Sequence, residues 1–192
     1  MNTHAILMSA VAGLSLTGLA ISQDNDDYEF HAFLSGAQEV TPPDAPATPS
    51  LGVATDTLGL VRVEFARDLS AFNFVLNVRN GRAVTQAHLH CGRPGENGPI
   101  IVFLSAPNEN GQDVDGQLAR GTRANEHIEA SAAECEALIG QPVRNIASLA
   151  LAAYKGLIYA NVHTVNNPAG EIRGQLIHDG DDLDDDDDDL FQ

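Results

Sequence analysis

Hydrophobic and polar side chains alternate along two neighbouring segments of the chain, residues 59–65 and 71–78. Successive side chains of a β-strand point to opposite faces, so a period of two predicts strands with one buried face. Asp68, Asn80 and Gly81 interrupt the alternation and are typical of turns. A chain with this pattern is expected to fold as an antiparallel sheet with one face packed against a core.

The rest of the chain adds further short strands and a small helical segment. Strands are predicted at residues 28–34, 84–90, 100–104, 157–164 and 171–177. The glycine-punctuated segment 116–121 is assigned no strand. Residues 125–139 and 145–155 are rich in Ala, Leu and Glu and predict two helices, the first with Asn125 as its N-cap. The predicted fold is therefore mostly β: an antiparallel, Greek-key-like sandwich or barrel with a small helical insertion at about 125–155.

The two ends of the chain differ from its middle. Residues 1–22 are mostly apolar or small and end in small residues, which is typical of a secretory signal. We therefore expect a secreted protein, extracellular or periplasmic, that begins near Gln23 with an acidic leader to residue 29. No other segment has the length and hydrophobicity of a membrane span. Residues 179–192 are rich in Asp and predict a disordered, solubilising tail, with weak calcium capture as the alternative.

The net charge of −17 is concentrated at these ends. Nine of the 27 acidic residues lie in residues 179–192 and four lie in residues 24–29, so 14 acids face the 10 basic residues in between. The domain itself is therefore close to neutral. Nucleic-acid binding is disfavoured, because neutralising phosphates requires a strongly basic face.

The chain has two cysteines, Cys91 and Cys135. In an exported protein a single pair predicts one disulfide. The alternative is that Cys91 is itself a soft metal ligand, because it directly follows a pair of histidines.

His88 and His90 lie two residues apart in a predicted strand, and His163 lies in a later one. The two-residue spacing places His88 and His90 on one face, where His163 could meet them. Three imidazoles can hold copper, zinc, iron or nickel. The alternative is that these histidines are solvated or satisfied by backbone carbonyls. His31 is a further candidate ligand, whereas His127 and His178 are expected to be solvated.

The strands 157–164 and 171–177 are joined by a short loop and are expected to pair, which would bring His163 and Arg173 onto neighbouring strands. Arg173 shares a face with Glu171 and could be a simple surface partner of that carboxylate. Its functional alternative is to attract a small anion to the mouth of the site. The sequence contains no nucleophilic triad, phosphate-binding loop or dinucleotide motif.

Several segments together resemble the CHRD domain, a module named after the extracellular protein chordin. The resemblance covers about residues 30 to 177, within an expected domain of residues 30–178. The matching segments are Phe33-Leu34-Ser35-Gly36-Ala37-Gln38-Glu39-Val40, Ala87-His88-Leu89-His90-Cys91-Gly92, Gly95-Glu96-Asn97-Gly98-Pro99, Gly116-Gln117-Leu118, Tyr159-Ala160-Asn161-Val162-His163-Thr164 and Pro168-Ala169-Gly170-Glu171-Ile172-Arg173-Gly174-Gln175-Leu176.

The CHRD resemblance implies an extracellular module but no defined activity. A more distant likeness is to copper–zinc superoxide dismutase, which also carries a His-X-His strand, a later histidine and an arginine near its last strand. That likeness implies that His88, His90 and His163 bind copper and that Arg173 guides superoxide. The zinc-binding loop of that family is missing here, so no second metal is expected.

Three hypotheses follow for the function of the chain. The first is a copper site with superoxide dismutase-like activity on a small anion. The second is a non-catalytic module that binds an unknown extracellular protein. The third is a metal carrier that uses the same histidines without turnover.

Overall fold

The two alternating segments form paired antiparallel strands in the computed structural model, which describes residues 28–40 and 52–180. β2 (Leu58–Phe65) pairs with the first part of β3 (Ala71–Cys91), and Val63 lies opposite Phe74. Both of these side chains are buried, as the alternation predicts. The predicted signal, the leader up to residue 27 and the tail from residue 181 lie outside the described residues.

β3 is one continuous strand of 21 residues, so the prediction of a turn at Asn80 and Gly81 was wrong. Asn80 and Ala83 have positive φ values of 56° and 48°, and the pairing register shifts around them. A side chain at Gly81 would come within 2.8 Å of Val78. These residues therefore bend the strand as a β-bulge instead of reversing it.

The bend lets the two halves of β3 join different neighbours. Its first half lies between β2 and β5 (Gln112–Ala124), and its second half lies between β6 (Ile158–Thr164) and β4 (Ile100–Ser105). β5 includes the segment 116–121, for which no strand was predicted. Its exposed, charged residues and its glycines conceal an edge strand from a pattern-based prediction.

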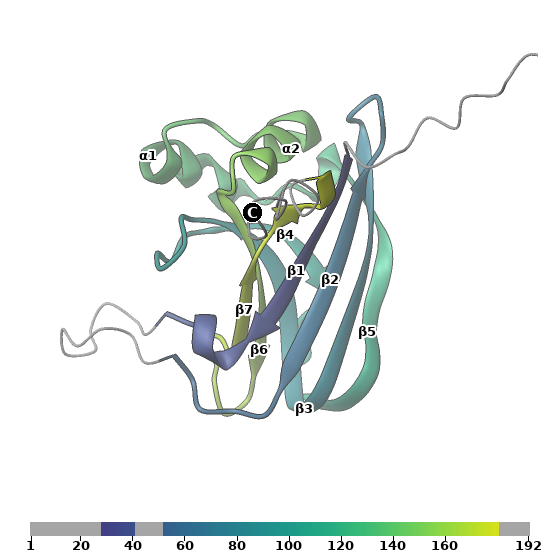
Figure 1. Cartoon of the computed structure of the whole chain (residues 1–192), viewed down its shortest axis with the longest axis vertical. Coiled ribbons are helices and arrows are strands. Elements are labelled where there is room, and N and C mark those ends of the chain that lie inside the picture. The colour runs from purple at the N-terminus through teal and green to yellow at the C-terminus, as the bar shows by residue number, and fades with distance from the viewer. Residues whose placement is uncertain (1–27, 41–51, 181–192) are drawn as a thin grey trace, which may run out of the picture.

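The last strands close the sheet on itself. β7 (Ile172–Gln175) pairs with β6 as the predicted hairpin and meets β1 (Glu29–Ser35) where Ser35 lies opposite Arg173. β8 (Ile177–His178) returns to β1. The eight described strands form an antiparallel, closed, barrel-like sheet around one hydrophobic core, which confirms the predicted fold class (Figure 1).

The helical insertion is present, but its first helix is broken. Short 3-10 turns cover Gly36–Gln38, Asn125–His127 and Ala130–Glu134, and the α-helices are α1 (Cys135–Ile139) and α2 (Ile146–Tyr154). Both α-helices lie at the same end of the barrel (Figure 1).

The helix predicted for residues 125–139 is interrupted because its backbone is tied to β4. The amide of Glu129 donates to the carbonyl of Ile101, and the Asn125 side chain accepts from Ile146 at the start of α2 instead of capping its own segment. The second prediction is confirmed, since α2 begins after Asn145, which caps the amide of Ser148. No helix in residues 28–40 and 52–180 has the length and hydrophobicity to cross a membrane.

Candidate metal centre

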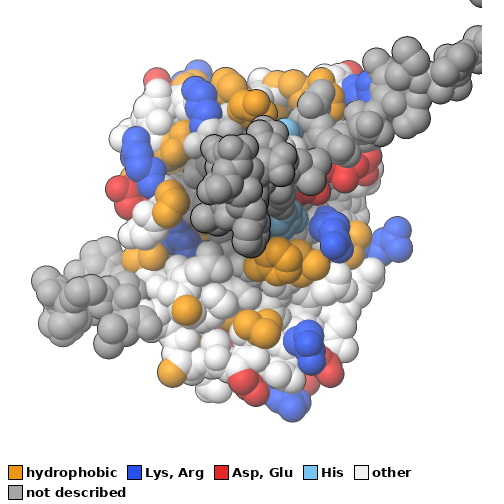
Figure 2. All heavy atoms as spheres, viewed as in Figure 1, with side chains coloured by type: hydrophobic (Ala, Val, Ile, Leu, Met, Phe, Trp, Pro, Cys, Tyr) orange, Lys and Arg blue, Asp and Glu red, His pale blue; other side chains and the backbone are white. Residues whose placement is uncertain are grey.

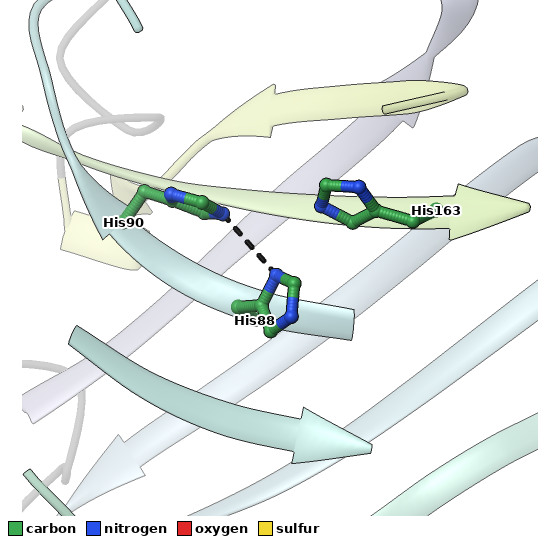
Figure 3. Close-up of side chains that lie close together, drawn as sticks. All are labelled: His88, His90 and His163. Atoms are coloured by element: carbon green, nitrogen blue, oxygen red, sulfur yellow. Dashed lines mark hydrogen bonds between the residues drawn. The ribbon is translucent and has the colours of Figure 1, made fainter. Parts of the chain in front are cut away.

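His88, His90 and His163 meet on one face of the sheet, as the sequence predicts. His88 and His90 come from the second half of β3, and His163 comes from the neighbouring strand β6 (Figure 3). His88 lies opposite Asn161, two residues before His163, so its partner histidine is a diagonal cross-strand neighbour. One potential ligand atom from each histidine lies within 4.8 Å of the others, and no other such group occurs in the described residues.

The three histidines are buried, although they point away from the barrel core. Their exposed fractions are 0% for His88, 8% for His90 and 7% for His163. The opposite face of the same strand segment, with Ala87 and Leu89, packs into the core. The histidines therefore lie on the outward face of the sheet, buried beneath the loops that contain Gly98 and Pro168.

Two backbone carbonyls in the covering loops fix the orientation of two imidazoles. The Nδ1 atom of His90 lies 2.9 Å from the carbonyl of Gly98, and that of His163 lies 2.9 Å from the carbonyl of Pro168. A carbonyl oxygen can only accept, so Nδ1 carries the proton in both rings and Nε2 keeps its lone pair, which in His90 faces Nδ1 of His88. This tautomer is the one that presents Nε2 to a metal ion.

His88 completes the cluster from the buried side. Its Nδ1 atom lies 3.3 Å from Nε2 of His90, and its ring packs edge-on against Phe103 with centroids 4.6 Å apart. The buried Nε2 atoms of His88 and His163 have no hydrogen-bond partner in the described part of the chain. Buried polar atoms in native proteins are normally satisfied, so these two nitrogens require an explanation.

Burial also keeps the histidines neutral. Removal from water lowers the pKa of His88 to about 2, and the neighbouring His163 and His90 add to this effect. Burial lowers the pKa of His90 to about 4 against the opposing hydrogen bond to Gly98. It also lowers the pKa of His163. Neutral imidazole is the form that binds metals, so the cluster is ready to act as a ligand set at neutral pH.

The donor set and its dimensions fit a transition-metal ion. Nitrogen donors bind such ions at about 2 Å, so two ligands of one ion lie at most about 4 Å apart. The largest separation in the cluster, up to 4.8 Å, therefore has to close by at least about 0.8 Å for one ion to reach all three nitrogens. The ligand set contains imidazoles alone, because Cys91 is not free. Such a set suits copper or zinc.

The predicted disulfide is confirmed and braces the end of the ligand strand. Cys91 and Cys135 are bonded, with their Cα atoms 5.9 Å apart. The bond connects the last residue of β3, next to His90, to the first residue of α1. The alternative of Cys91 as a metal ligand is thereby overturned.

Arg173 lies next to this cluster but is 2% exposed. It follows the hairpin pairing expected from the sequence and lies opposite Asn161. Its Nη1 atom donates to Asn97 at 3.2 Å, and its Nη2 atom donates to the carbonyl of Arg93 at 3.0 Å. The guanidinium also lies 3.5 Å above the ring of Tyr159. None of these contacts is with Glu171.

Glu171 instead connects the segment before β2 to the end of β6 and the loop that follows it. Its carboxylate accepts hydrogen bonds from the side chains of Thr55, Thr57, Thr164 and Asn167. Burial alone raises the pKa of Glu171, but these hydrogen bonds outweigh that effect and lower it. The alternative of a surface pair between Glu171 and Arg173 is therefore not what the structure contains.

The sequence did not predict the hydrogen bond that joins Glu39 to Asn161, the residue opposite His88. Glu39 is buried, and its Oε2 atom accepts from Asn161 at 2.6 Å. Burial raises the pKa of Glu39, whereas its hydrogen bonds and the charge of Arg173 oppose that shift. Asn161 shares the face of His163 by alternation, which was an available signal. Glu39 lies far away in sequence, and its signal was its place in the segment Phe33 to Val40 that resembles the CHRD domain.

The remaining histidines lie outside the cluster. His31 contacts Asp179 at 2.5 Å and is not one of the grouped ligands. His127 is exposed, and its Nδ1 atom accepts from the amide of Ala124. His178 is buried against Phe30 and Tyr154, so the expectation that it is solvated was wrong. Its position was set by the pairing of β8 with β1.

Comparison with known proteins gives one clear result. The family model described as the CHRD domain matches residues 30–176. Searches of the curated proteins and of the solved structures gave no significant match.

Proposed function

From the premise that this chain belongs to the CHRD domain family, we propose that it is an exported protein whose three histidines bind one copper ion. The family is an extracellular type of module, and an intramolecular disulfide is typical of proteins in oxidising compartments. The apolar residues 1–22 add support from the sequence.

One observation carries the copper proposal: the buried Nε2 atoms of His88 and His163 have no hydrogen-bond partner in the described residues. An unsatisfied buried polar group costs about 1–3 kcal/mol. Two such atoms within one cluster of three buried imidazoles are difficult to explain as a core feature. Coordination of an ion by the cluster would give these imidazoles a partner and would replace the hydrogen bond between Nε2 of His90 and Nδ1 of His88.

The all-imidazole set favours copper among the candidate ions. Carboxylate-rich sites suit calcium, magnesium and manganese, whereas imidazole suits copper, zinc, iron and nickel. Among these four, a given set of nitrogen donors binds Cu²⁺ most tightly. Zinc is the competing ion against which the experiment tests copper.

The proposed reaction is the dismutation of superoxide. His90 and His163 retain 8% and 7% exposure, which suits contact with a very small molecule. When bound, copper would supply one-electron exchange: one superoxide is oxidised to dioxygen, and a second takes up the electron and two protons to become hydrogen peroxide. The protein residues hold the imidazoles neutral and exclude bulk water from His88.

The test begins with the purified protein after chelator treatment. Copper and zinc are titrated separately and in competition, bound metal is counted, and the Cu²⁺ complex is examined by electron paramagnetic resonance. We expect one copper per chain, nitrogen hyperfine structure from imidazoles and displacement of zinc by copper. Superoxide decay is then followed by stopped flow with and without copper.

Each outcome separates the hypotheses. No stoichiometric metal would overturn the site and leave the binding module for an extracellular partner. Preference for zinc would overturn copper as the ion. Tight copper binding without superoxide decay would overturn the reaction and favour the carrier.

A further inference from the structure

We propose that Arg173 is a positioning residue that latches the covering loop, residues 92–99, over His90. This inference rests on the proposed copper site, and it differs from the steering role expected from the sequence. A steering arginine acts through its charge at the mouth of a site. A latch acts through the forked geometry of its donors.

The donors of Arg173 are directed at two points of the covering loop. Nη1 donates to Oδ1 of Asn97 at 3.2 Å, and Nη2 donates to the carbonyl of Arg93 at 3.0 Å. The adjacent Gln175 adds a third tie, because its Nε2 atom donates to the carbonyl of Gly92 at 2.9 Å. The strand β7 therefore holds the loop at its beginning and near its end.

The covering loop in turn holds His90. The carbonyl of Gly98 accepts from Nδ1 of His90 at 2.9 Å, and the amide of Gly98 donates to the Tyr159 hydroxyl at 3.2 Å. The ring of Tyr159 stacks on His90, with centroids 4.8 Å apart and planes 5° from parallel. Because Arg173 also lies 3.5 Å over the Tyr159 ring, it contacts both elements that orient this imidazole.

The loop fits too closely to allow much displacement. A side chain at Gly98 would come within 1.8 Å of the carbonyl of Cys91. A side chain at Gly92 would come within 2.7 Å of the carbonyl of Glu96 and 2.9 Å of Tyr159. The loop backbone is therefore packed directly against the ligand strand and its stacking partner, and release of the loop would remove the carbonyl that fixes the His90 tautomer.

The charge of Arg173 is poorly placed to act at long range. The side chain is 2% exposed, and the negative charges of Glu39 and Glu96 act on it. On the face seen in Figure 2, Lys and Arg side chains are interspersed with Asp and Glu. Opposite charges close to a buried guanidinium weaken the field that it presents to a distant anion.

Arg173→Lys separates the two roles, because lysine keeps the charge but loses the fork. Arg173→Gln removes both, and Asn97→Ala removes one acceptor at an exposed loop position without touching the charge. Arg82→Lys, at an exposed arginine that pairs with Asp113, is the matched control. Each variant is examined for copper affinity by competition, for its electron paramagnetic resonance spectrum and, without metal, for hydrogen exchange of the Gly98 amide.

For a latch, Arg173→Lys and Arg173→Gln both lower copper affinity by about 10- to 100-fold, the usual effect of losing a residue that orients a ligand. Both change the copper spectrum and speed exchange at Gly98. Asn97→Ala shows the same changes to a smaller extent, and Arg82→Lys shows none. The exchange experiment needs no metal, so it tests the latch even if the wild-type protein fails to bind copper.

The inference is overturned if Arg173→Lys retains wild-type exchange at Gly98, wild-type copper affinity and an unchanged spectrum. If Arg173 steers superoxide, added salt and Arg173→Gln should both slow superoxide decay. Arg173→Lys should then keep the wild-type rate.

Discussion

The two halves of β3 follow the same alternation, but their outward faces meet different surroundings. In the first half, the outward side chains of Asn73 and Arg79 are exposed. In the second half, the outward side chains of His88 and His90 are covered by loops. The inward residues of both halves lie in one core. Alternation therefore decides which face a residue occupies, whereas the loops decide whether the outward face becomes a site.

The largest effect is expected for inward residues, and it should be similar in both halves. Leu76→Ala and Leu89→Ala each remove a fully buried side chain and should lower the free energy of unfolding by about 2–5 kcal/mol. Urea denaturation of the metal-free protein measures this. Only Leu89→Ala should also weaken copper binding, because Leu89 lies between the two ligands of β3. An equal loss of copper affinity in Leu76→Ala would contradict the division into two halves.

The next effect concerns the outward face of the covered half and its neighbour β6. His163→Gln removes one of three ligands and should lower copper affinity by more than the roughly 100-fold typical of losing an orienting residue. Competition titration measures this. His127→Gln is the matched control, since His127 is exposed and lies outside the cluster. Copper binding that is equal in the two variants would remove His163 from the site.

Much of this arrangement was predictable, because it depends on local pattern. The spacing of His88 and His90 gave their shared face, and the short connection between β6 and β7 gave the hairpin that places His163 near Arg173. The cysteine pair gave the disulfide.

The sequence-based predictions fail where residues distant in the sequence determine the local structure. Asn80 and Gly81 favour positive φ, which serves a turn or a bulge equally well, and only the pairing of β3 with two sets of strands selects the bulge. The broken helix after Asn125 has the same origin, since its backbone is tied to β4. The burial of the histidines depends on the loop carbonyls of Gly98 and Pro168, which no periodicity indicates.

The smallest predicted effect is a pH dependence confined to the covered half. In the metal-free protein the folded pKa values of His88 and His90 are lowered to about 2 and about 4, against 6.5 in the unfolded chain. The unfolded state therefore binds more protons below pH 6.5. The contribution of these two histidines to the free energy of unfolding is fully present above pH 6.5. It is lost as the pH falls toward the folded values, by about 2 kcal/mol for each histidine at pH 5.

Urea denaturation at pH 7.5 and pH 5.0 measures this loss. Replacing His88 by Gln should remove one histidine's share of the difference between the two pH values, whereas His127→Gln at the exposed position should leave it unchanged. Because copper binds the neutral imidazoles, saturation of the wild-type protein with copper should deepen the dependence, since protons then compete with the ion as well as with the fold. A wild-type protein equally stable at both pH values would mean that the histidines of the covered half are hydrated like the outward side chains of the first half, and the contrast between the two halves of β3 would then not extend to their electrostatics.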